Sequence, residues 1–138
     1  MAVRIVTDSG IDVPGGSDPR ITVVPLGITF GTTTYADGVD LTNDRFYELL
    51  IESDDLPKTS QATPFMYHEV LAPICEAGDE AVVITLSSKL SGTHQSAVTA
   101  ASEFDGVYVV DSKNVTIGQT ILVQYALRLV DEGLGAAE

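Results

Sequence analysis

Two short segments concentrate hydroxyl groups immediately before stretches with helical periodicity. They are Lys58–Thr63 and Ser87–Thr93. Helix N-termini present unpaired backbone N–H groups and the positive end of the helix dipole, so they favour anions. Serine and threonine hydroxyls add donors, and Gly92 lets the backbone approach a ligand closely. The two segments therefore predict a pocket for a small anionic group.

A third polar turn, Asp111-Ser112-Lys113, follows the next predicted strand along the chain. Ligands of open α/β sheets bind beyond the carboxyl ends of the strands, so we expect these segments to meet at one edge of the sheet. The candidate binding residues are Thr59, Ser60, Gln61, Ser91, Gly92, Thr93, Asp111 and Ser112.

Three other interpretations compete with anion binding at these segments. Serine and threonine residues before helices often serve only as caps. Ser91 followed by His94 is compatible with a serine hydrolase, although the G-x-S-x-G sequence of a nucleophile elbow is absent. A module that binds a small phosphorylated metabolite is the other alternative, although the usual glycine-rich phosphate-binding sequences do not occur.

The composition disfavours several classes of partner. Twenty Asp and Glu residues against seven Lys and Arg residues give a formal net charge of −13. Binding to nucleic acid requires Lys and Arg to displace counterions from phosphates, and an anionic membrane surface repels an acidic protein. The single cysteine, Cys75, forms no zinc-binding spacing with His68 and His94. We therefore expect no nucleic-acid partner, no metal and no cofactor.

The apolar segments are short throughout the chain. The longest uninterrupted runs, Ala81–Ile84 and Val107–Val110, have four residues each. A membrane-spanning helix needs ~20, and the amino-terminal residues are too mixed for a signal peptide. The sequence therefore predicts no membrane insertion and a cytoplasmic location.

Strand-like and helix-like patterns alternate along the chain, most regularly after Thr63. We predict strands over 3–7, 21–26, 81–86 and 107–110, a hairpin or extended edge over 28–35, and a loop over 15–19. We predict helices from Thr42 through Leu50, from the cap Thr63 to the stop at Gly78, and over 92–104 and 116–132. This order predicts right-handed crossovers and an open, mostly parallel α/β sheet with helices on both faces.

Two of these elements carry expectations about burial. The strands Ala81–Leu86 and Val107–Val110 are apolar on both faces, which is typical of strands covered on both sides. The last helix is expected to bury a stripe of Leu122, Tyr125, Ala126 and Leu129.

Several longer motifs occur in a distinctive order. They are Thr7-Asp8-Ser9, Pro25-Leu26, Tyr35-Ala36-Asp37-Gly38-Val39-Asp40, Lys58-Thr59-Ser60-Gln61, the stretch from Thr85 to Ala97, and Asp111-Ser112. Together they resemble the amino-terminal α/β domain of DegV family proteins, the bacterial fatty-acid-binding proteins that serve fatty acid kinase. The resemblance extends along essentially all 138 residues, and the stretch from Thr85 to Ala97 is its most specific part.

The resemblance implies binding rather than catalysis. In the family an acyl chain lies in a buried tunnel, and hydroxyls at the positions of Thr59 and Ser91 hold its carboxylate. It also implies a long-chain fatty acid as the ligand and a fatty acid kinase as the partner. The kinase product, an acyl phosphate, feeds phospholipid synthesis. His94 stands where family members often have an aromatic residue.

The resemblance further implies a second domain. Family members are about twice this long, and their second α/β domain completes the tunnel. We therefore expect residues 1–138 to form the amino-terminal domain, with the carboxy-terminal family domain absent from this chain. A natural short form would instead have to build the missing wall by self-association.

Overall fold

A four-stranded parallel sheet lies at the centre of the computed structural model, which describes residues 1–12 and 18–138. Its strand order is β2-β1-β6-β7. The strands are Val3–Asp8 (β1), Ile21–Val24 (β2), Glu80–Thr85 (β6) and Val107–Asp111 (β7). Residues 15–17 of the predicted 15–19 loop lie outside the described residues.

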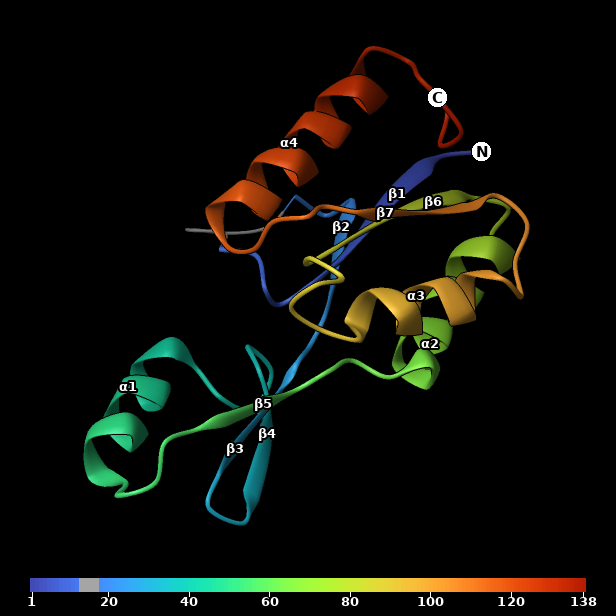
Figure 1. The fold of residues 1–138 in the computed structure, drawn as a ribbon. Coiled ribbons are helices and arrows are strands. Elements are labelled where there is room, and N and C mark those ends of the chain that lie inside the picture. The colour runs from blue at the N-terminus through green and yellow to red at the C-terminus, as the bar shows by residue number, and fades with distance from the viewer. Residues whose placement is uncertain (13–17) are drawn as a thin grey trace.

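Helices cover both faces of this sheet, as predicted (Figure 1). Helices α2 (Pro64–Glu76) and α3 (Thr93–Ala101) cover one face, and α4 (Ile117–Asp131) covers the other. Successive residues of a strand point to opposite faces. Val6 of β1 therefore joins the core beneath α2 and α3, whereas Ile5 packs with Val123 beneath α4.

The two predicted buried strands differ in the structure. Strand β6 is central and mostly buried, as predicted. The prediction was wrong for β7, because this strand lies at the sheet edge and Tyr108 and Val110 are 41% and 44% exposed. Helix α4 packs against β1 and β6. The part of the α4 face of the sheet that β7 forms therefore stays uncovered.

The buried stripe of α4 was only partly predicted. Leu122 and Ala126 pack against the core as expected, and Leu129 is half-buried. Tyr125, however, is 55% exposed, and Val123 is the apolar side chain of this helix that is fully buried.

A second, antiparallel sheet extends from the parallel one (Figure 1). It has the order β4-β3-β5, with strands Gly27–Phe30 (β3), Thr33–Ala36 (β4) and Lys58–Ser60 (β5). Helix α1 (Asn43–Glu52) lies between β4 and β5 along the chain. The predicted hairpin is confirmed as β3 and β4. We did not predict β5, which takes its backbone partners from β3 and has only three residues.

The predicted helix caps are present. The Thr42 hydroxyl accepts the Arg45 N–H at 3.2 Å, and the Thr63 hydroxyl accepts the Met66 N–H at 3.3 Å. Within the described residues, no helix combines the length and apolar character that crossing a bilayer requires.

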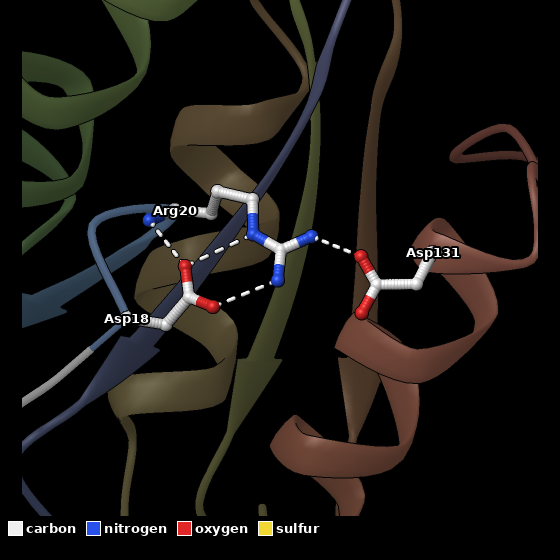
Figure 2. A network of polar contacts seen from close by, with 3 residues as sticks. All are labelled: Asp18, Arg20 and Asp131. Atoms are coloured by element: carbon white, nitrogen blue, oxygen red, sulfur yellow. Dashed lines mark hydrogen bonds and ion pairs between the residues drawn. The ribbon is translucent and has the colours of Figure 1, made fainter.

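An ion-pair network fastens the carboxyl end of α4 to the segment before β2 (Figure 2). Arg20 donates to both carboxylate oxygens of Asp18, at 2.9 and 2.7 Å, and to Asp131 at 2.6 Å. The bidentate contact with Arg20 lowers the pKa of Asp18 to about 2. The ion pair between Asp18 and Arg20 therefore persists in solutions well below neutral pH.

Candidate functional site

The loop from Leu86 to Gly92, here called the Ser91 loop, leaves the carboxyl end of β6 and enters α3. Its first residue is held by a buried aspartate at the end of β1. The Asp8 carboxylate accepts the Leu86 N–H at 2.8 Å and the Gly10 N–H at 2.9 Å. Asp8 therefore fixes the position at which the Ser91 loop begins.

A second aspartate holds the middle of the Ser91 loop from the neighbouring strand. Asp111 accepts the backbone N–H of Ser88 at 3.1 Å and the Ser88 hydroxyl at 2.5 Å. The Ser88 hydroxyl is the main cause that lowers the pKa of Asp111 to about 2. Ser112 accepts the Asn114 N–H at 3.1 Å and donates to the Asn114 carbonyl at 3.0 Å. The same Asn114 carbonyl accepts the Ser87 N–H at 2.8 Å, so Asp111 supports the loop directly and Ser112 supports it through Asn114.

Ser91 and Thr93 form a hydroxyl pair where the loop enters α3. Their side-chain oxygens lie 2.9 Å apart, and the Ser91 oxygen also accepts the Thr93 N–H at 3.2 Å. Thr93 is completely buried, whereas Ser91 is partly exposed. Ser91 is therefore the member of the pair that a ligand can reach.

The predicted meeting of the two hydroxyl-rich segments is present at two contacts, and a third contact joins the first segment to Ser96 of α3. The Ala62 N–H donates to the Thr93 hydroxyl at 3.2 Å, and the Gln61 side-chain amide donates to the Ser96 hydroxyl at 3.3 Å. Gln61 also lies directly over Gly92, where any Cβ would overlap its side-chain oxygen. A side chain at position 92 would therefore have to displace the end of the Gln61 side chain from this contact.

Thr59 and Ser60 lie on β5 rather than in a loop, which corrects the predicted environment of these two residues. Thr59 is exposed and pairs with Ile28 of β3. Ser60 points to the opposite face and covers Gly27. Within the described residues, no hydrogen bond joins Thr59 to Ser91. Thr59 therefore belongs to the antiparallel sheet and precedes by two residues Gln61, which makes the contact with α3.

His94 makes its hydrogen bond with Thr85 rather than with Ser91. One of its ring nitrogens, Nδ1, lies 2.9 Å from the Thr85 hydroxyl, and the Ser91 hydroxyl bonds to Thr93 instead. A nucleophilic serine needs hydrogen-bond contact with its base. The geometry gives the hydrolase alternative no support.

Beneath the Ser91 loop lies a buried polar cluster that we did not predict. Gln119 of α4 donates to the Thr7 hydroxyl at 3.0 Å and to Asp8 at 3.2 Å, and all three side chains are fully buried. Burial raises the pKa of Asp8, and hydrogen bonds from Leu86, Gln119 and Gly10 oppose that effect. The signal in the sequence is an aspartate directly after the predicted strand 3–7.

The α4 face of the sheet contains an apolar cavity of about 260 Å³. Its lining includes Val82, Val110, Leu122 and Tyr125. The Ser91 loop enters α3 on the opposite face, so this cavity is not continuous with the hydroxyl pair. In the described ranges, no three His, Cys, Asp or Glu side chains form a group suited to a metal ion.

The family model described as "Uncharacterised protein, DegV family" matches residues 2–138. The chain belongs to the DegV family. A DegV domain-containing protein of Caldanaerobacter subterraneus subsp. tengcongensis is 40% identical over 140 residues, which cover 99% of this chain and 50% of the relative. The chain spans about half the length of the curated relatives it matches.

Solved structures of DegV relatives share the fold. The stearic acid-binding protein from Eubacterium ventriosum has a TM-score of 0.87 and 34% identity, over 98% of this chain and 49% of that one. A fatty-acid-binding DegV family protein from Thermus thermophilus has a TM-score of 0.85 and 35% identity, with the same two coverages. DegV from Bacillus subtilis, also named a fatty-acid-binding protein, has a TM-score of 0.85 and 29% identity, over 96% and 49%. The matching region of these proteins is therefore built like this chain.

Proposed function

We propose that the protein binds a long-chain fatty acid, holds its carboxylate with the Ser91 and Thr59 hydroxyls, and presents it to a fatty acid kinase. The observation that carries this proposal is the partly exposed Ser91 hydroxyl, fixed at the start of α3 in a fold whose relatives are named fatty-acid-binding proteins. The relatives' ligands support the ligand class. The partly exposed hydroxyl of the Ser91 loop supports the role proposed for Ser91, and the role proposed for Thr59 is the one that the family resemblance implies.

The proposed headgroup site suits a carboxylate. An anion at a helix N-terminus gains roughly 0.3–2 kcal/mol from the helix dipole. A hydrogen bond to a charged group contributes about 1.5–3 kcal/mol. The two aspartates that face the Ser91 loop accept hydrogen bonds from its backbone and from Ser88, so their charges are already solvated by donors of the loop. The Ser91 hydroxyl is left to serve the ligand.

The acyl tail contributes most of the affinity in this proposal. Burial of methylene groups is worth ~0.8 kcal/mol each, which for a long chain reaches on the order of 10 kcal/mol before ordering costs. The hydroxyls therefore select the headgroup and set its orientation, and the tail sets the strength of binding. A fatty acid held by its carboxylate end presents that end, the group a kinase would phosphorylate.

We propose that the chain acts without catalysing a reaction itself. A hydrolase would need His94 in contact with Ser91, and His94 bonds to Thr85 instead. In this proposal Gln61 and Gly92 join the two segments that carry Thr59 and Ser91. Asp111, at the end of β7, and Ser112, in the turn that follows, support this arrangement.

The test is a comparison of two ligands that share a chain and differ in their headgroup. Dissociation constants are measured for hexadecanoic acid and hexadecan-1-ol with the unmodified protein, Ser91→Ala and Thr59→Val. We expect Ser91→Ala to lower the preference for the acid at least tenfold, because it removes a charge-assisted hydrogen bond, and Thr59→Val to lower it to a smaller extent. Affinity for the alcohol should stay nearly constant.

Matched controls keep the comparison specific. Ser102→Ala removes an exposed hydroxyl at the other end of α3, and Thr33→Val alters an exposed threonine on β4 of the same antiparallel sheet as Thr59. Both should bind as the unmodified protein does. An unchanged preference for the acid in Ser91→Ala would remove Ser91 from the headgroup site.

A further inference from the structure

The hydroxyl pair at the start of α3 is asymmetric in its surroundings. The Thr93 side chain is completely buried and its oxygen accepts the Ala62 N–H at 3.2 Å. The Ser91 oxygen accepts the Thr93 N–H at 3.2 Å and lies 2.9 Å from the Thr93 oxygen. Each oxygen therefore already accepts one backbone hydrogen, and the remaining question is which hydroxyl donates to the other.

Burial decides the direction of that hydrogen bond. Among the described residues, the Thr93 hydroxyl has two hydrogen-bond partners, the Ala62 N–H and the Ser91 hydroxyl. The Ala62 N–H is a donor, so of these two partners the Ser91 oxygen is the one that can accept the Thr93 hydrogen. If Ser91 donated to Thr93, the Thr93 hydrogen would be buried without an acceptor, at a cost of about 1–3 kcal/mol. Thr93 therefore donates to Ser91, and the hydrogen of the Ser91 hydroxyl is free.

We propose that Thr93 is a positioning residue for the fatty-acid headgroup: it links the Ala62 N–H to Ser91 in a hydrogen-bond relay that aims the Ser91 hydroxyl at the carboxylate. This inference rests on the proposed function. The relay runs from the Ala62 N–H to the Thr93 oxygen, from the Thr93 O–H to the Ser91 oxygen, and from the Ser91 O–H to the ligand. No proton is transferred and no bond is broken.

The relay does two things for the Ser91 hydroxyl. It occupies the acceptor positions of the Ser91 oxygen, so that the group meets the ligand as a donor. Successive hydrogen bonds in one direction also polarise one another, which strengthens the last donor in the series. Because Ala62 follows Gln61 in the other hydroxyl-rich segment, the relay makes the donor strength of Ser91 depend on the contact between the two segments.

The experiment is a double-mutant cycle on the preference for hexadecanoic acid over hexadecan-1-ol. We expect Thr93→Val, which keeps the shape of the side chain, to lower that preference roughly five- to tenfold, and Thr93→Ser to restore it. In the Ser91→Ala background, Thr93→Val should lower the preference no further, because its effect passes through Ser91.

Thr120→Val is the control that distinguishes a loss of protein stability from a loss of the Ser91 hydroxyl's orientation. Thr120 of α4 is also buried, and its hydroxyl accepts the Asp12 N–H at 3.0 Å on the other face of the sheet. Thr120→Val should lower the urea midpoint of unfolding, as Thr93→Val does, and should leave the preference for the acid unchanged. If Thr93→Val cannot be folded, Thr93→Ser and Thr93→Ala replace it in the cycle, with the serine expected to match the unmodified protein and the alanine to lose preference.

The outcomes distinguish the relay from the function on which it rests. An unchanged preference in Thr93→Val, with a loss in Ser91→Ala, would overturn the relay and leave the headgroup site intact. Equal losses from Thr93→Val with and without Ser91 would also overturn the relay, since they indicate a purely structural role. An unchanged preference in Ser91→Ala itself would overturn both.

Discussion

Asp8 and Asp111 hold the same loop from two strands of one sheet, yet their surroundings are opposite. Asp8 is fully buried between the two helical layers, and its carboxylate accepts backbone N–H groups of Leu86 and Gly10. Asp111 is partly exposed on the edge strand and accepts the N–H and hydroxyl of Ser88. Burial raises the pKa of Asp8, whereas the hydrogen bond from the Ser88 hydroxyl lowers the pKa of Asp111.

The difference separates two ways of fixing a binding loop. At Asp8 the carboxylate satisfies the Leu86 N–H in a buried hydrogen bond and the Gly10 N–H in a partly buried one, so its contribution is geometric and survives changes in ionic strength. At Asp111 water can replace the lost partner, so the contribution is small and electrostatic. The start of the Ser91 loop is therefore fixed more firmly than its middle.

The largest expected effect is that of Asp8→Asn. The two Asp8 oxygens accept the N–H groups of Leu86 and Gly10, and asparagine replaces one of these oxygens with an NH2 group. The NH2 group would face the N–H of Leu86 or Gly10, and that N–H would lose its acceptor. We expect the free energy of unfolding to fall by about 2 kcal/mol, measured by urea denaturation at pH 7. A stability equal to that of the unmodified protein would mean that Asp8 does not fix the loop.

The same substitution at the exposed position should have a smaller effect. Asp111→Asn keeps an acceptor for Ser88 and alters a partly exposed side chain, so we expect a loss of less than about 1 kcal/mol in the same denaturation experiment. Exposed Asp44, in the first turn of α1, offers the control Asp44→Asn. A larger loss in Asp111→Asn than in Asp8→Asn would reverse the comparison.

The smallest effects are opposite responses to pH. Because the pKa of Asp8 is raised, folded protein binds its proton more tightly than unfolded protein, and this group makes stability decline as pH rises above the ordinary value of 3.8. Because the pKa of Asp111 is lowered to about 2, its contribution is present above pH 3.8 and is lost as pH falls from there toward 2.

These two slopes can be measured separately. Unfolding free energies between pH 2 and 7 should show the decline with rising pH removed in Asp8→Asn, and the loss with falling pH reduced in Asp111→Asn. If both substitutions removed the same pH dependence of the unfolding free energy, the assignment of opposite pKa shifts to Asp8 and Asp111 would be wrong.

The parts of the fold that depend on local sequence were predictable. The caps at Thr42 and Thr63 and the central strand β6 each follow from neighbouring residues, and the structure contains all three. Strand β5 was missed because three residues carry too little pattern and their backbone partners lie on β3. The exposure of β7 depends on which strand lies at the edge and on where α4 packs, which periodicity does not specify.

The candidate site divides in the same way. Hydroxyl groups before a helix were sufficient to select Ser91, Thr93 and their neighbours as candidates. The distribution of roles among them required coordinates, because the contact of Ala62 with Thr93 joins segments 31 residues apart. Asp8 was missed as a support because its partner Leu86 is 78 residues away along the chain.

Native mass spectrometry of the purified protein, followed by denaturation to release and weigh any ligand, tests fatty-acid binding most directly. We predict one long-chain fatty acid per chain, either retained from the expression host or taken up when hexadecanoic acid is added, and reduced retention in Ser91→Ala relative to Ser102→Ala. A protein that carries no acyl chain and remains unliganded after addition of the acid would contradict the proposed function.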